Sequence, residues 1–289
     1  MKRITIHLFD LISDSNRDLA VLLKKINETP KPQRWRDIGG YQVALLAINF
    51  DEPNERVFMD FVKRRAVGPG KVKADSEIDG FDFDTGENFG EETSALWDSK
   101  HKWLAVQYNQ SGVRAHSITS YFNVFHHDPD SDWTSAAVLD TSTQAKLKTK
   151  QLVRSATLSV TMTEAMTEAL RDAGQSLGDA FAGMAKAAEP ATIEITLGMA
   201  HKKGFLKKAF SGAVTNLRQL VGREEGLHKL QIKARETEDG PDEVIDLLKH
   251  RIKSSYSSGD LRVHMGRYTV ESRWRALGRV HAGWLEELG

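Results

Sequence analysis

The sequence predicts a mixed α+β protein with two lobes, and three observations support that prediction. Segments in which apolar and polar residues alternate, as they do in half-buried strands, recur through residues 1–145. In residues 146–289, strand patterns are separated by longer amphipathic helix patterns. A polar run at residues 141–150 lies between the two halves. We therefore expect a strand-rich antiparallel N-terminal lobe and a C-terminal lobe of helices packed on a sheet.

The N-terminal lobe begins with a strand and a helix. Residues 4–11 alternate, and the apolar residues between Leu19 and Ile26 share one helical face. Asn16 or Asp18 is suited to cap this helix, and Pro30 ends it. Four strands follow, at residues 41–50, 57–65, 93–97 and 103–108, and they form two hairpins. The last expected elements of this lobe are a helix at residues 113–125 and a strand at residues 136–139.

The C-terminal lobe alternates strands and helices. Pro241 at an early helical position, with Asp242 and Glu243 at the positive end of the helix dipole, predicts a helix from residue 240 to Ile252. The other expected elements are strands at residues 152–160, 192–197, 227–235 and 261–265, and helices at residues 161–186, 204–221 and 269–288.

Composition and motif content exclude several functions. The 289 residues include no cysteine, which excludes disulfides, thiolate nucleophiles, iron–sulfur clusters and cysteine zinc sites. The N-terminal apolar run is too short for a signal peptide, and no apolar stretch approaches the roughly 18 residues of a membrane span. No Walker loop or G-x-G-x-x-G motif occurs. We expect a cytoplasmic protein with no cofactor and no membrane partner.

Charge is unevenly distributed, although 40 Lys and Arg residues balance 40 Asp and Glu residues. Residues 74–99 contain nine acids and no Lys or Arg, whereas residues 196–235 contain nine Lys and Arg against two Glu. A dipolar molecule of this kind attracts phosphate chains at its basic end. Alternatively, the two segments pair with each other, within or between subunits, or are only solvated faces.

The basic segment is the best candidate for phosphate contacts. On the helix predicted at residues 204–221, Lys208 and Arg218 lie away from the apolar stripe. Lys202 and Lys203 precede the helix, where backbone N–H groups also attract anions. The candidate nucleic-acid-binding residues are Lys202, Lys203, Lys207, Lys208, Arg218, Arg223, Lys229, Lys233 and Arg235.

Metal-dependent hydrolysis is a weaker hypothesis. His101, His127–Asp128 and Asp179 follow the order of metal phosphohydrolase ligands, and residues 126–132 offer a smaller loop site. The two histidines fall in predicted loops, whereas those enzymes place their ligands on helices. A solvated loop explains the same residues, so we expect no metal.

Two further motifs have simple structural explanations. The G-x-S-x-G match at residues 174–178 lies inside a predicted helix, whereas a nucleophilic serine needs a strand–turn–helix. Gln231 and Lys233 resemble part of a nuclease site with Glu194, but a helix separates the strands where that fold has a hairpin. We therefore assign no catalytic residue.

Two apolar helical seams predict self-association. One includes Met166, Leu170 and Leu177, and the other includes Trp274 and Trp284. The second seam fits either an intramolecular core or a subunit contact. We expect a homo-oligomer.

Residues 91–93, 103–113 and 268–277 resemble a family of uncharacterised bacterial and prophage proteins. More distantly, they resemble the soluble B component of the Kiwa anti-phage defence system, which implies a DNA-associated defence protein. The resemblance spans most of the chain but includes no catalytic motif, so it implies no active-site residues.

Together these observations predict a cytoplasmic protein that contacts nucleic-acid phosphates, without reading bases, through its C-terminal basic lobe. The acidic residues 74–99 would occlude that surface when no nucleic acid is bound. The first alternative is a homo-oligomeric protein-interaction component that uses the acidic segment to bind a protein partner. The second is the metal-dependent hydrolase or nuclease.

Overall fold

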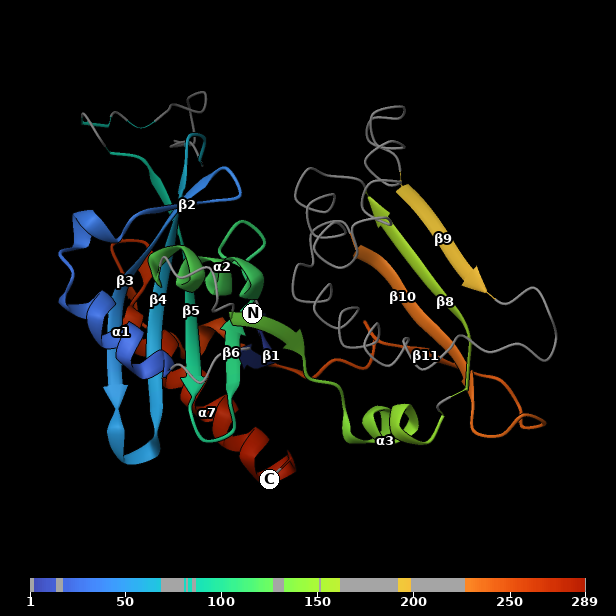
Figure 1. Cartoon of the computed structure of the whole chain (residues 1–289). Coiled ribbons are helices and arrows are strands. Elements are labelled where there is room, and N and C mark those ends of the chain that lie inside the picture. Colours follow the sequence, from blue (N-terminus) through green and yellow to red (C-terminus); the bar gives the residue numbers. More distant parts are fainter. Residues whose placement is uncertain are drawn as a thin grey trace.

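The computed structural model describes residues 3–13, 18–68, 81, 83–84, 87–126, 133–150, 152–161, 192–198 and 227–288. Over these residues the protein is a mixed α+β structure with antiparallel sheets, a strand-rich N-terminal region and a C-terminal helix (Figure 1). The predicted fold class is confirmed.

The larger sheet has eight strands in the order β12-β1-β6-β5-β4-β3-β2, and β7 also pairs with β1. Every pairing in it is antiparallel. Its strands are β1 (Arg3–Ser13), β2 (Arg36–Ile38), β3 (Tyr41–Asp51), β4 (Arg56–Arg65), β5 (Phe89–Asp98), β6 (Trp103–Gln107), β7 (Trp133–Ala137) and β12 (Lys253–Ser257).

A second, four-stranded antiparallel sheet has the order β11-β10-β8-β9. It lies beside the larger sheet (Figure 1), and apolar side chains of both sheets belong to one buried cluster. The remaining strands are β8 (Leu152–Thr161), β9 (Thr192–Gly198), β10 (Leu227–Arg235) and β11 (Glu243–Asp246), with a small hairpin of β13 (Val263–His264) and β14 (Arg267–Tyr268).

Helices cover both faces of the eight-stranded sheet. Alternate side chains of β4 point to opposite faces, so Val57, Met59 and Phe61 pack with α1 and α2, whereas Phe58 packs with α7. In the described ranges, no helix has the length and apolar character needed to cross a membrane. The helices are α1 (Leu19–Glu28), α2 (Ala115–His126), α3 (Thr141–Thr149) and α7 (Val270–Leu288), with single 3-10 turns η1 (Lys31–Arg34), η2 (Glu52–Asn54) and η3 (Ser258–Asp260).

Helix α1 shows how local sequence signals determine an element. Asp18 caps it, because its Oδ1 accepts a hydrogen bond from the Ala20 backbone N–H at 2.8 Å. The apolar positions between Leu19 and Ile26 are buried against the sheet, and the helix ends at Glu28, before Pro30. The predicted strand, helix and both hairpins of the N-terminal lobe are confirmed, with their ends shifted by a few residues.

The helix predicted from residue 240 to Ile252 is wrong. Residues Glu243–Asp246 form β11, which pairs with β10. Val244 is 57% exposed and Ile245 only 2%, an alternation that fits a strand and not a helix face. The free edge of β10 and the β-branched pair Val244–Ile245 favour a strand. Together they outweigh the helix-start signal of Pro241 and the acids that follow it.

The end of the chain returns to the first sheet. Strand β12, which the sequence did not predict, pairs with β1, where Arg3 faces Ser257 and His7 faces Lys253. The strand predicted at residues 261–265 is confined to the two residues of β13. The predicted C-terminal lobe, residues 146–289, is thus divided between the two sheets.

The apolar seam of α7 is intramolecular core. Leu277 and Trp284 are buried at 0% and 3% exposure against Ile6, Leu8 and Leu96 of the sheet. This seam therefore gives no support to a subunit contact. The other seam, within the helix predicted at residues 161–186, lies outside the described residues, and the homo-oligomer remains a prediction.

A buried ion-pair network joins α7 to the centre of the sheet. Arg273 donates to Asp60 of β4 at 2.8 Å and to Glu92 of β5 at 2.7 Å. Ser94 donates to Asp60 at 2.6 Å, and Arg267 donates to Glu92. Burial raises the pKa of Asp60 to about 6, against the lowering effects of Arg273 and Ser94. Burial also acts to raise the pKa of Glu92, but the two arginines outweigh it and lower that pKa.

We expect Arg273→Ala to lower the free energy of unfolding by about 3–5 kcal/mol, because it leaves the Asp60 carboxyl buried without its cation. Urea titration followed by circular dichroism measures this difference. The matched control is Arg275→Ala on the exposed face of α7, with an expected change under about 0.5 kcal/mol. Equal effects of the two substitutions would contradict the role of the network.

Candidate functional site

Three of the predicted nucleic-acid-binding residues lie on β10, and each contacts a carboxylate, one of which is shared by two cations. Lys229 contacts Glu194 at 3.4 Å, and Lys233 and Arg235 contact Asp242 at 3.1 and 2.7 Å. Strand alternation places the three cations together on the face opposite the buried Leu230, Ile232 and Ala234. The other six, Lys202, Lys203, Lys207, Lys208, Arg218 and Arg223, lie outside the described residues.

The motifs weighed for catalysis do not form a site in the described part of the chain. Gln231 donates to Asp246 at 3.0 Å, and β8 separates β10 from β9, which bears Glu194. His101 contacts Asp98, and His126 stacks on Trp133 with ring centroids 5.7 Å apart. No group of three potential metal ligands occurs among the described residues. Residues 127–132 and 174–179 lie outside them.

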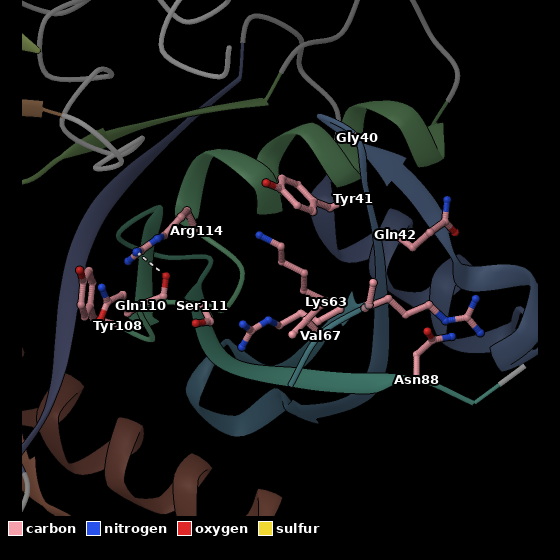
Figure 2. Close-up of a pocket in the computed structure, with 13 residues that line it drawn as sticks. Gly40, Tyr41, Gln42, Lys63, Val67, Asn88, Tyr108, Gln110, Ser111 and Arg114 are labelled. Atoms are coloured by element: carbon pink, nitrogen blue, oxygen red, sulfur yellow. Dashed lines mark hydrogen bonds between the residues drawn. The ribbon is translucent and has the colours of Figure 1, made fainter. Parts of the chain in front are cut away.

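A basic pocket opens instead at one end of the eight-stranded sheet, with a volume of about 970 Å³. It has four cations in its wall and no Asp or Glu among the described residues that line it. Figure 2 shows Tyr108 and Arg114 on one side of the pocket and Tyr41 and Lys63 on the other. The residues of this basic pocket are Gly40, Tyr41, Gln42, Lys63, Arg64, Arg65, Ala66, Val67, Asn88, Tyr108, Gln110, Ser111 and Arg114.

Strand alternation explains why these side chains meet. On β4, Lys63 and Arg65 continue the series that contains the buried Met59 and Phe61, so they lie on the same face as α1 and α2. Tyr41 lies on that face of β3, next to the pair formed by Val43 and Lys63. The apolar core ends here, and the face continues as a basic and aromatic surface.

Tight local geometry fixes the two aromatic walls. A two-residue turn, Gly39–Gly40, joins β2 to β3 with φ of 58° and 78°, values that glycine adopts readily, and Tyr41 follows at once. The Lys63 Nζ lies 3.6 Å from the centroid of the Tyr41 ring. On the opposite wall, the Arg114 guanidinium lies 4.3 Å from the centroid of Tyr108 and donates to the Gln110 carbonyl at 3.0 Å.

The described side chains that line the pocket include four cations and no carboxylate. One of the cations, Arg65, pairs with Glu91 of β5 at 2.5 Å. Helix α2 begins at Ala115, directly after Arg114, so the positive end of its dipole lies beside the pocket. These features favour an anionic ligand.

The sequence reasoning missed this pocket, although one signal was present. Lys63, Arg64 and Arg65 form a run of three cations at the end of a predicted strand. Arg114 contributes from a loop some 50 residues later, and only the fold brings it to the run.

A second polar cluster is buried and structural. The Asp98 carboxylate lies 2.8 Å from Nε2 of His281 and 2.8 Å from Nδ1 of His101. His281 is fully buried, so no solute reaches it, and the cluster joins α7 to the β5–β6 turn. Burial acts to raise the pKa of Asp98, but the hydrogen bonds from His281 and His101 outweigh it and hold that pKa well below its ordinary value.

Comparison with known proteins gives one match. A family model described as "Family of unknown function (DUF6731)" matches residues 10–261, which is most of the chain. No curated protein matches the chain.

The Asp98 cluster predicts acid sensitivity. Because its folded pKa lies below the ordinary Asp value of about 3.9, the carboxylate stabilises the fold above that pH, and the stabilisation is lost as pH falls further. We expect the stability difference between the wild type and Asp98→Asn to be largest near neutrality and to shrink below about pH 4. Urea unfolding across this range measures it. Exposed Asp260→Asn is the control, and a difference for Asp98→Asn that is independent of pH would contradict the assignment.

Proposed function

The chain belongs to the DUF6731 family, a family of unknown function, and we propose that it binds nucleic acid through phosphate contacts in the basic pocket. The observation that supports the proposal best is the convergence of the Lys63, Arg65 and Arg114 side chains in one concave site, with Arg64 next to them at the end of β4. Phosphate contacts of this kind supply most of the sequence-independent affinity of nucleic-acid-binding proteins.

Aromatic side chains in the same pocket favour nucleic acid over a small anion. Tyr41 is 50% exposed and Tyr108 is 39% exposed, although both are large and partly apolar. Basic grooves that follow a nucleic-acid backbone commonly combine cations with aromatic rings on which bases stack. A site for inorganic phosphate alone has no use for exposed rings.

The proposal moves the binding surface from the C-terminal lobe to the N-terminal one. Lys229, Lys233 and Arg235 already have carboxylate partners, so each would have to give up an ion pair in order to bind phosphate. Residues 202–223 remain a predicted additional contact.

An acidic protein segment is the main alternative ligand, because it too would be attracted to the basic pocket. The distant resemblance to the soluble B component of the Kiwa system implies DNA association, and we include an anti-phage role in the proposal on that basis. Genomic neighbours test this role: a defence or prophage cassette supports it, and a metabolic operon opposes it.

Salt dependence is the sharpest test of phosphate binding. Contacts from Lys63, Arg65 and Arg114 would neutralise about three phosphates. Raising salt from 50 to 200 mM should then weaken binding about 20-fold for a single strand and about 40-fold for a duplex. The double substitution Lys63→Ala and Arg114→Ala should weaken binding at 50 mM and lower the single-strand slope by about 1.4. Fluorescence anisotropy with labelled oligonucleotides measures both quantities.

The control is Lys229→Ala with Lys233→Ala, which removes two cations from β10 and should leave affinity and slope unchanged. Urea unfolding establishes that every variant is folded. Loss of binding in the β10 variant but not in the pocket variant would transfer the function back to the C-terminal lobe. Polyglutamate that binds as tightly as an oligonucleotide of equal charge would favour the protein-partner alternative.

A further inference from the structure

A second pocket lies next to the basic pocket on the same sheet. Its volume is about 440 Å³. Like the basic pocket it is lined by cations, here Arg251 and Lys253. Both pockets are lined by Tyr108. The residues of this second pocket are Thr5, His7, Tyr108, Arg251, Lys253, Ser254 and Ser255.

Sheet register places the two pockets on one face. His7 belongs to the series of β1 that contains the buried Phe9 and Leu11 on the α1/α2 face. Lys253 faces His7 and Ser255 faces Thr5, so these side chains share that face. On the other side of β1, the Tyr108 backbone N–H donates to the Thr5 carbonyl at 2.7 Å, and the His7 and Tyr108 rings lie 5.2 Å apart. Tyr108 therefore stands at the junction of the two pockets.

The two pockets together extend across most of the sheet. From Lys253 to Tyr41 the strand order is β12-β1-β6-β5-β4-β3, which is five interstrand steps. At 4.7–4.9 Å a step this is about 24 Å. A nucleic-acid strand with the 3.4 Å rise of B-DNA places about seven nucleotides over that length, and an extended strand places fewer.

We infer that the two pockets form one track for single-stranded nucleic acid, crossing the sheet from Lys253 through Tyr108 to Tyr41. This inference rests on the proposed function and names its substrate class. The cations at both ends contact phosphates, and a base stacks on the Tyr41 ring face opposite Lys63.

The shape and chemistry of the track favour a single strand over a duplex. Duplex readers insert a helix or a ribbon into a groove of the DNA, whereas this site is concave and lies at the end of a sheet, next to the start of α2. Exposed tyrosines contribute to binding only when bases are unstacked and available, as they are in single strands.

The test is anisotropy at 50 mM salt with oligothymidylates of 2 to 12 nucleotides, the matching oligouridylates and a 12-base-pair duplex. Affinity should rise with length and level off at no more than about seven nucleotides, and the 12-mer single strand should bind more tightly than the duplex. The two oligonucleotide series distinguish DNA from RNA as the source of the strand.

Substitutions at each end of the track test its length. Lys253→Ala should weaken the 12-mer about eight-fold, the effect of one lost phosphate contact at this salt, and leave a trinucleotide in the basic pocket unaffected. Exposed Lys249, which lines neither pocket, is the matched control, and Lys249→Ala should change nothing. Tyr41→Leu should weaken the 12-mer about 5- to 150-fold and leave inorganic polyphosphate, which has no bases, unaffected.

The outcomes separate this inference from the proposed function. Absence of binding to every nucleic acid by folded protein overturns both. Tighter binding of the duplex, a plateau at three nucleotides, or a Lys253→Ala variant that binds the 12-mer like the wild type overturns the single-strand track and leaves phosphate binding at the basic pocket intact.

Discussion

The guanidinium of Arg273 is buried between α7 and the larger sheet. It holds α7 against one face of that sheet. It joins the last helix to β4 through Asp60 and to β5 through Glu92. Desolvation of three charges is costly, and only the close geometry and the additional donors Ser94 and Arg267 offset it. Because α7 covers this face, the opposite face must accommodate α1, α2 and the basic pocket at its open end.

Strand alternation lets the same two strands serve both faces. On β5, Glu92 faces Arg273 beneath α7, whereas its neighbour Glu91 faces the pocket and holds Arg65. On β4, Asp60 belongs to the α7 face, and Lys63 belongs to the pocket face. A shift of one residue in the β4–β5 register would therefore move the side chains of a strand to the opposite face of the sheet. The pocket cations would be buried, and the groups that form the buried ion pairs would be exposed.

Local sequence patterns predicted most of the helices and strands. The features that were not predicted depend on pairing between segments far apart in the sequence. The Asp18 cap and the alternating hairpins depend on neighbouring residues, and they were predicted. Strand β12 contains the string Lys-Ser-Ser-Tyr-Ser, in which only Tyr256 is buried, and it is a strand because β1 offers it an edge. The pocket was equally invisible, because Tyr41, Lys63, Tyr108 and Arg114 belong to segments that only the sheet order brings together.

The candidate site also shows that partners, more than the number of cations, determine where a neutral protein can bind an anion. The β10 face has three cations, but Asp242 lies within 3.1 Å of Lys233 and Arg235, and Glu194 lies near Lys229. Phosphate binding there would require these ion pairs to open. In the basic pocket, the rings of Tyr41 and Tyr108 hold Lys63 and Arg114 in position. A ring orients a cation without cancelling its charge. Sequence reasoning counts charges, and only the fold reveals which groups lie beside each of them.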